Sequence, residues 1–249
     1  MKTQVKTQQE IVDMRESGRI LATILQDLIE GTEAGMTTSD IDKRARALLE
    51  KHKSKAAFLD YNGFPGAICI SVNDEIAHGI PGNRVMREGD LIHYDFGVRY
   101  KGMITDAGIG FVIGTPTPDQ QRLLAGTKKA LDAAIATIRD GVRVGDIGAA
   151  VESTLERYDL ACIYELCGHG VGHQVHEDPI IPNYGTAGTG EALRTGMTVA
   201  LEPNVSLGSH EMYLAEDGWT WTTKDHSLST QAEHTVLVTD DGCEILTQL

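Results

Sequence analysis

A short segment, CGHGVGHQVHEDP at residues 167–179, places three histidines within eight positions. They are His169, His173 and His176. Imidazole binds metals and exchanges protons near neutral pH, so the segment is a candidate for either chemistry. The glycines that alternate with its first residues disfavour a helix, which excludes the helical HExxH arrangement of many zinc sites. We therefore expect an extended segment in which His169 can point inward.

Two aspartates, Asp95 and Asp106, flank a predicted hairpin in the segment 89–111. Lys101 and Gly102 between them are a signal for a tight turn. A turn there lays the aspartates nearly opposite each other, with both side chains on one face. An isolated pair of this kind is ordinarily solvated on an outward face. If the pair is buried instead, the carboxylates repel each other and a cation between them is expected.

Two glutamates lie at the ends of apolar, strand-like segments. Glu202 ends the segment GMTVALEP, and Glu233 opens the segment EHTVLVTD. Acids among β-branched residues are difficult to place as ordinary surface charges. Together with Asp95, Asp106 and the histidine-rich segment, they predict a metal cluster with mainly hard oxygen donors.

The periodicity of apolar residues predicts both helices and strands, and therefore an α+β protein. Helices are predicted at 8–30, 38–52 and 115–140, the second starting at Thr38 or Ser39, and strands at 66–73, 91–98, 196–203, 233–240 and 243–246.

The segments 35–52 and 141–158 resemble each other at an offset of 106 residues. Each copy follows a long predicted helix and precedes strands. Chance explains one aligned pair as well, but the matching helices favour a duplication. We predict one domain, 1–249, made of two similar halves at about 8–125 and 126–249, with a cleft between the halves.

Charge and composition restrict the class of partner and the compartment. The chain has 22 basic and 36 acidic residues and a net charge of −14, which disfavours nucleic acid as a direct partner. Its four cysteines include no CxxC pair and do not predict a disulfide framework. Neither a signal-peptide pattern nor a run of 18 apolar residues occurs. We expect a reduced, cytoplasmic protein without a membrane span.

The five candidate ligands and their flanks resemble the type I methionine aminopeptidases. The resemblance covers nearly the whole chain, including YNGFPGAICISVNDEIAHGIPG at 61–82 and the segment 217–247. It implies the pita-bread fold, a pseudo-twofold, curved antiparallel sheet with helices outside. It also implies a metalloaminopeptidase that removes the initiator methionine from nascent proteins and peptides and prefers a small second residue.

The same resemblance implies two divalent metal ions, which can be manganese, iron, cobalt or zinc. Asp95 and Glu233 are expected to bridge the metals, Asp106 to complete the shell of one, and His169 and Glu202 that of the other. A hydroxide between the metals would attack the first peptide carbonyl, and Glu202 would accept its proton.

Two further histidines match non-ligand positions of the family. His176 is expected to stabilise the oxyanion, and His78 to hold or protonate the leaving amide nitrogen. His173 has no role in the family. The pocket for the methionine side chain is expected to be lined by four residues, Tyr61, Phe64, Cys69 and Trp219.

The chain departs from the family pattern at three positions. Val175 stands where phenylalanine is usual, which widens the expected methionine pocket. Ala107 replaces a threonine, which is expected to remove a hydroxyl beside the metal shell, and Asn204 stands where methionine is common. No ligand is lost, so an active enzyme is expected.

Two alternatives stay open. One is an X-Pro peptidase of the same fold, a prolidase or aminopeptidase P, although these usually carry an extra N-terminal domain. The other is a metal-free binding module for RNA or ribosomes. The only compact basic cluster, Lys51, Lys53 and Lys55, is more typical of a solvated helix end than of a ribosome contact. We expect a monomer, with a transient ribosome contact left open.

Overall fold

The computed structural model describes residues 5–248, so the two ends of the predicted domain, residues 1–4 and 249, lie outside it. Helix α1 (Gln8–Glu30) has the predicted bounds. It begins with a capping box, in which the Thr7 hydroxyl accepts from the Glu10 N–H and the Glu10 carboxylate accepts from the Thr7 N–H. A cap of this type stabilises a helix by about 1 kcal/mol, so these two residues fix where the chain turns into α1.

Helix α2 (Thr38–Lys51) agrees with the predicted range within one residue. Its N-cap is Thr37, so the prediction of Thr38 or Ser39 as the cap is wrong. The backbone of Thr37 is extended and its hydroxyl accepts the N–H of Asp40, whereas Thr38 is already the first helical residue.

A long hairpin forms the centre of the first half of the chain. Strands β4 (Leu91–Tyr100) and β5 (Met103–Val112) are joined by Lys101 and Gly102, both with positive φ, as the predicted tight turn requires. Asp106 pairs with Gly97, two positions from Asp95 on the neighbouring strand. Since side chains alternate along a strand, Asp95 and Asp106 share one face, as predicted. Strands β1 (Lys55–Ala56) and β2 (Cys69–Val72) pair with β4 on its other edge.

The second half opens with two packed helices. Helix α3 (Pro118–Thr137) begins later than the predicted residue 115, because Thr117 caps it and Pro118 takes the first helical position. Helix α4 (Val144–Arg157) packs against α3. A five-stranded antiparallel sheet follows, in the order β15 (Cys243–Ile245), β14 (His234–Val238), β9 (Thr198–Leu201), β7 (Cys167–Gly170) and β8 (Glu177–Pro182).

Shorter elements that were not predicted complete the fold. They are the 3-10 turn η1 (Tyr61–Gly63) and the strands β3 (Glu75–Ala77), β6 (Ala161–Cys162), β10 (Asn204–Ser206), β11 (Met212–Leu214), β12 (Trp221–Thr223) and β13 (Ser229–Gln231).

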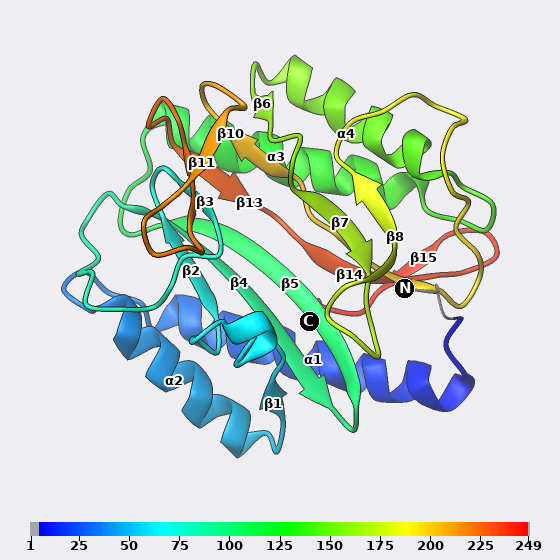
Figure 1. Cartoon of the computed structure of the whole chain (residues 1–249), viewed down its shortest axis with the longest axis horizontal. Coiled ribbons are helices and arrows are strands. Elements are labelled where there is room, and N and C mark those ends of the chain that lie inside the picture. Colours follow the sequence, from blue (N-terminus) through cyan, green and yellow to red (C-terminus); the bar gives the residue numbers. More distant parts are fainter. Residues whose placement is uncertain (1–4, 249) are drawn as a thin grey trace.

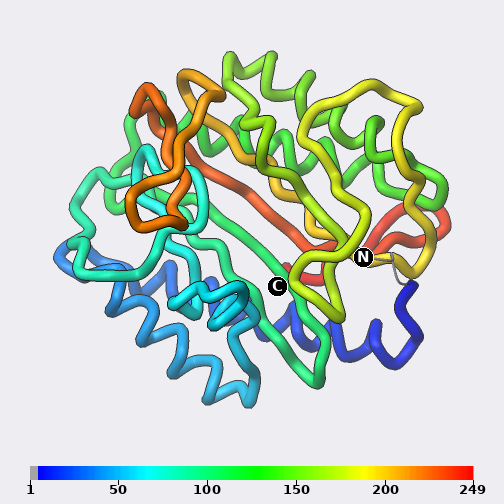
Figure 2. The backbone as a smooth tube through the Cα atoms, viewed as in Figure 1, coloured from blue at the N-terminus to red at the C-terminus, as the bar shows by residue number. Residues whose placement is uncertain are grey.

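Figure 1 shows how the elements are arranged, with α1 and α2 beside the β4–β5 hairpin and α3 and α4 on the opposite side of the molecule. The hairpin and the strands β13 and β14 cross the middle between these helix pairs, and the backbone trace in Figure 2 follows the same path. The two halves meet where the Glu233 N–H donates to the Gly108 carbonyl over 2.8 Å. Each side has its own apolar core, one around α1 and β4 and the other around α3, α4 and β9.

Within residues 5–248, none of the helices is both long and apolar enough to cross a membrane.

The repeated segments have matching local structure. The bounds of α4 equal those of α2 shifted by 106 residues, and both helices carry an aspartate at the third position that accepts the N–H of the cap residue. Lys53 and Asp159, also 106 apart, both have positive φ just after the helix. The division into halves at 8–125 and 126–249 stays a prediction, and we propose a duplication as its origin.

Candidate metal centre

The five residues predicted as ligands line one cavity of about 160 Å³. They come from both halves of the chain. Asp95 and Asp106 lie on β4 and β5, His169 on β7, Glu202 directly after β9, and Glu233 directly before β14.

The ligand atoms are close enough to share cations. One ligand atom from each of Asp106, His169 and Glu233 lies within 4.8 Å of the other two. His169 Nε2 is 3.4 Å from Glu202 Oε1. His169 Nδ1 lies 2.9 Å from the carbonyl of Gly170, which can only accept, so Nδ1 carries the proton and Nε2 is free to bind a metal.

Because the carboxylates are buried together, their ionised forms are unfavourable unless cations neutralise them. Removal from water raises the pKa of Asp95 to about 7. Burial also raises the pKa values of Asp106, Glu202 and Glu233 well above the usual range, and repulsion from Asp95 adds to each. The pKa of His169 falls to about 3, mainly through burial. Four carboxylates and one neutral imidazole are a suitable donor set for divalent metals of intermediate hardness.

Two buried atoms point to the same conclusion. Within the described part of the chain, Oδ1 of Asp95 and Oδ1 of Asp106 are buried and have no hydrogen-bond partner. Buried polar atoms in folded proteins nearly always have a partner, so an orphaned pair in one cavity supports a cation-binding role for these two oxygens. The residues present therefore fit a divalent metal site.

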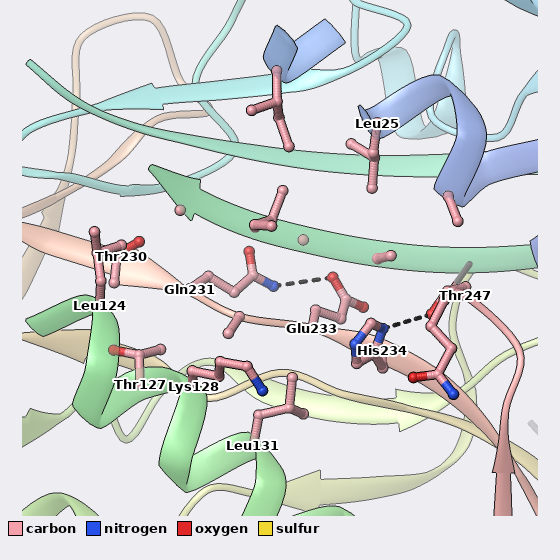
Figure 3. A pocket seen from close by; sticks show the side chains of 18 of the residues that line it. Leu25, Leu124, Thr127, Lys128, Leu131, Thr230, Gln231, Glu233, His234 and Thr247 are labelled. Atoms are coloured by element: carbon pink, nitrogen blue, oxygen red, sulfur yellow. Dashed lines mark hydrogen bonds between the residues drawn. The ribbon is translucent and has the colours of Figure 1, made fainter. Parts of the chain in front are cut away.

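Gln231 forms hydrogen bonds with two of the predicted ligands. Its Nε2 donates to Glu202 Oε2 over 3.1 Å and to Glu233 Oε2 over 3.2 Å. Its Oε1 accepts from Nε2 of His93, which is buried, over 2.6 Å. The bond to Glu233 is drawn in Figure 3. Neither Gln231 nor His93 was predicted, because an amide or a histidine on an apolar strand has no distinctive spacing.

The backbone of Asp106 is also fixed across the junction of the halves. Its N–H donates to the Thr235 hydroxyl over 2.8 Å, and that hydroxyl donates to the Asp106 carbonyl over 2.7 Å. In the second half of the chain, the Asn204 side chain supports Glu202, because its Nδ2 donates to Glu202 Oε2 over 3.1 Å. The amide at position 204 thus has a direct contact with a predicted ligand.

The two histidines predicted to act on the substrate also line the cavity. The His176 ring stands at a right-angled, edge-on contact with the His169 ring, with centroids 4.3 Å apart. Its Nδ1 is 3.0 Å from the Tyr61 hydroxyl. His78 has positive φ, and burial lowers its pKa to about 4. Both imidazoles therefore favour the neutral form at pH 7.

Part of the cavity wall is apolar. The predicted pocket residues Tyr61, Phe64, Cys69 and Trp219 all line it. Phe64 and Trp219 make an edge-to-face contact with centroids 5.3 Å apart, which holds both rings in place. The lining also includes Phe58, Asn62 and Val175.

A family model described as "Metallopeptidase family M24" matches residues 12–240. A methionine aminopeptidase of Mycoplasma capricolum is 38% identical over 245 residues, which cover 98% of each chain. The crystal structure of a methionine aminopeptidase from Thermotoga maritima superposes with a TM-score of 0.97 at 39% identity, covering 100% of both chains.

This chain belongs to metallopeptidase family M24, among the methionine aminopeptidases.

The family confirms the predicted fold class. A prolidase from Pyrococcus furiosus has a TM-score of 0.79 at 21% identity, with 98% of this chain and 65% of the prolidase covered. That likeness shows the fold alone. The mixed helices and antiparallel sheets are those of the pita-bread fold, as the resemblance implied.

In this chain, two of the three departures from the family pattern touch the cavity or its predicted ligands. Val175 is buried and lines the pocket, beside Phe64 and Trp219. Asn204 bonds to Glu202 as described above. Ala107 does not line this cavity and packs instead in the core around α1. Because it follows Asp106 on a strand, its side chain points to the other face, so the expectation of a lost hydroxyl beside the metal shell is wrong.

A second cavity, of about 790 Å³, is lined by residues of α1, β5, α3 and β13. Figure 3 shows Leu25 of α1 on one side of it and Leu124 and Leu131 of α3 on the other. Glu233 lines both cavities, and its neighbour His234 bonds through Nδ1 to the Thr247 hydroxyl over 2.9 Å. Of the five predicted ligands, Glu233 alone is among the lining residues of both cavities.

Proposed function

We propose that this protein is a dinuclear metalloaminopeptidase that removes the N-terminal methionine from peptides and nascent proteins and prefers a small second residue. The observation that carries the proposal is the convergence of four buried or partly buried carboxylates and one imidazole beside an apolar pocket. The names of the relatives support this activity, as does their full-length similarity.

The metals would be two divalent cations, of manganese, iron, cobalt or zinc. Asp95 and Glu233 would bridge them, Asp106 would complete the shell of one, and His169 and Glu202 that of the other. When bound, such a pair acidifies water and polarises a carbonyl, which supplies a nucleophile near neutral pH. The four negative carboxylates balance the four positive charges of the pair.

The side chains around the metals have separate roles in this scheme. Glu202 is placed beside His169 and would accept the proton of the attacking water. His176 would donate to the oxygen that becomes negative as the carbonyl is attacked, and Tyr61 orients its ring through Nδ1. His78, on the wall of the same cavity, would hold or protonate the leaving amide nitrogen.

Specificity would come from the apolar part of the cavity. Tyr61, Phe64, Cys69 and Trp219 surround a space suited to an unbranched thioether side chain. The free α-amine of the substrate would face the carboxylates and their metals, which restricts cleavage to the first residue. We further propose that the enzyme acts as a monomer in the cytoplasm, on polypeptides that leave the ribosome.

Peptide cleavage after metal depletion tests this function. The protein is stripped with chelator, supplied with single cations, and assayed with Met-Ala-Ser, Met-Lys-Ser and Ala-Pro-Ala. The proposal predicts methionine release from Met-Ala-Ser, much less from Met-Lys-Ser, and no cleavage of Ala-Pro-Ala. Cleavage of Ala-Pro-Ala alone would favour an X-Pro peptidase, and no cleavage with any cation would favour a binding module.

A further inference from the structure

The N-terminal segment before and at the start of α1 lies against the loop that carries His176. We call residues 5–10 the strap and residues 171–176 the histidine loop. The Lys6 N–H donates to the Gly196 carbonyl over 2.8 Å. The Lys6 side chain runs inward, is only 1% exposed, and donates from Nζ to Glu177 Oε2 over 2.7 Å.

Glu177 fixes the backbone of the histidine loop. Its side chain is 5% exposed, and the oxygen that does not bond Lys6 accepts two backbone N–H groups. The His173 N–H donates over 2.6 Å and the Gln174 N–H over 3.1 Å. Because the carboxylate is buried, it keeps this geometry only while a positive charge balances it. Lys6 supplies that charge.

The strap makes a second contact with the loop. Glu10 Oε1 is 2.7 Å from His173 Nε2. Glu10 also closes the capping box with Thr7, so this contact ties the loop to the first turn of α1. His173 was expected to have no role, and the structure gives it a defined contact between strap and loop.

The strap and the loop approach each other closely. A Cβ added at Gly172 would lie 2.3 Å from Lys6 Cε and would displace the Lys6 side chain, and the positive φ of Gly172 also favours glycine at this position. The Gly172 carbonyl accepts from the Ile104 N–H over 2.7 Å on the opposite side. The loop is thus held between β5 and the strap.

From these contacts we infer that Lys6 is a positioning residue that acts through Glu177 to set the histidine loop. Lys6 does not line the substrate cavity, whereas Val175 and His176 at the end of the loop do. A shift of about 1 Å in a group that acts on the substrate can cost about 100-fold in rate. The inference rests on the proposed function through the role of His176.

The test compares Lys6→Met with Lys43→Met in the protein loaded with Mn²⁺. Lys43 is the matched control, because its ion pair with Asp40 is exposed on α2. We expect Lys6→Met to lower kcat for Met-Ala-Ser by about 10- to 100-fold, with KM and bound manganese close to the parent values. Hydrogen exchange in the peptide spanning 171–177 should become faster in Lys6→Met and stay unchanged in Lys43→Met.

A double variant separates positioning from general stability. In Lys6→Met/Glu177→Gln the buried negative charge is gone, and the amide oxygen can still accept both N–H groups of the loop. Recovery of kcat and of slow exchange toward the parent values supports the inference. Parent-like kcat and exchange in Lys6→Met would overturn it, as would a double variant as slow as the single one.

A further variant covers the case in which Lys6→Met does not fold. His173→Ala removes the ring contact with Glu10 at a partly exposed site. We expect a smaller fall in kcat and faster exchange in the same peptide, and unchanged values would overturn the inference. If the parent itself releases no methionine, the proposed function fails, while the exchange data still decide whether the strap sets the loop.

Discussion

Asp95 and Asp106 lie two register positions apart on neighbouring strands, with their side chains on one face and the Oδ1 atom of each buried and without a hydrogen-bond partner among residues 5–248. Strand pairing fixes this arrangement before any ligand is bound. The fold therefore holds two carboxylates in a geometry in which the ionised pair is destabilising unless a cation lies between them.

Gln231→Leu should weaken the metal site without removing a ligand. The change deletes both hydrogen bonds that Gln231 donates, to Glu202 and to Glu233. Loss of such supporting bonds commonly lowers metal affinity or activity by about 10- to 100-fold. Titration of the stripped protein with Mn²⁺, followed by methionine release, measures both quantities. Unchanged affinity and rate would show that Gln231 does not support the ligands.

His176→Ala should lower kcat for Met-Ala-Ser by about 100- to 1000-fold, because a donor to the developing oxyanion is lost. Bound metal should stay at the parent level, since His176 is not among the proposed ligands. His226→Ala is the control, because that ring is exposed and pairs with Asp74. Equal kcat in His176→Ala and the parent would remove His176 from the mechanism.

Val175→Phe should sharpen selectivity for methionine. Val175 is buried beside Phe64 and Trp219, so a larger side chain there narrows the apolar pocket. Discrimination by one or a few methylene groups is typically worth about 10- to 200-fold. We expect the ratio of kcat/KM for Met-Ala-Ser over Leu-Ala-Ser to rise within that range. A ratio that stays constant or falls would place the selectivity elsewhere.

The way in which the free energy of unfolding depends on pH should differ between the metal-free and the metal-bound protein. In the metal-free protein the folded-state pKa values of Asp106, Glu202 and Glu233 are raised, so the folded form keeps protons that the unfolded chain releases. The stability that these groups contribute is present at low pH and is lost as the pH rises through their folded-state pKa values.

The effect is best measured between about pH 7.5 and 8.5, because there the buried histidines are neutral when folded and about nine-tenths or more neutral when unfolded. We expect the metal-free protein to lose about 1.4 kcal/mol of unfolding free energy per pH unit for each carboxylate that stays protonated. Mn²⁺ should remove or reverse this trend, since it binds the ionised carboxylates. Thermal unfolding with and without Mn²⁺ checks it, and a metal-free Tm that rises over this interval would contradict the account.

Much of the fold and the predicted site followed from local sequence. The hairpin was predictable because the Lys101-Gly102 turn and the strand period together set the register of Asp95 and Asp106. The bounds of α1 were predictable from an apolar period with a strong cap. The cap of α2 was not, because three adjacent residues, Thr37, Thr38 and Ser39, can each cap a helix.

Other features depend on contacts between distant segments. The bonds from Gln231 to the ligands and from Thr235 to Asp106 join segments that meet only in the folded protein. The position of the Ala107 side chain depends on strand alternation, which places it on the face opposite to that of Asp106. The contact of Lys6 with Glu177 spans 171 positions and has no sequence signal.

Anomalous diffraction from crystals grown with Mn²⁺ tests the central claim most directly. We predict two manganese peaks between Asp95 and Glu233, with Asp106 on one metal and with His169 and Glu202 on the other. An Asp95→Asn variant should lose at least one peak and its methionine release. An empty cavity in the parent at saturating Mn²⁺, with these side chains turned toward solvent, would contradict the account.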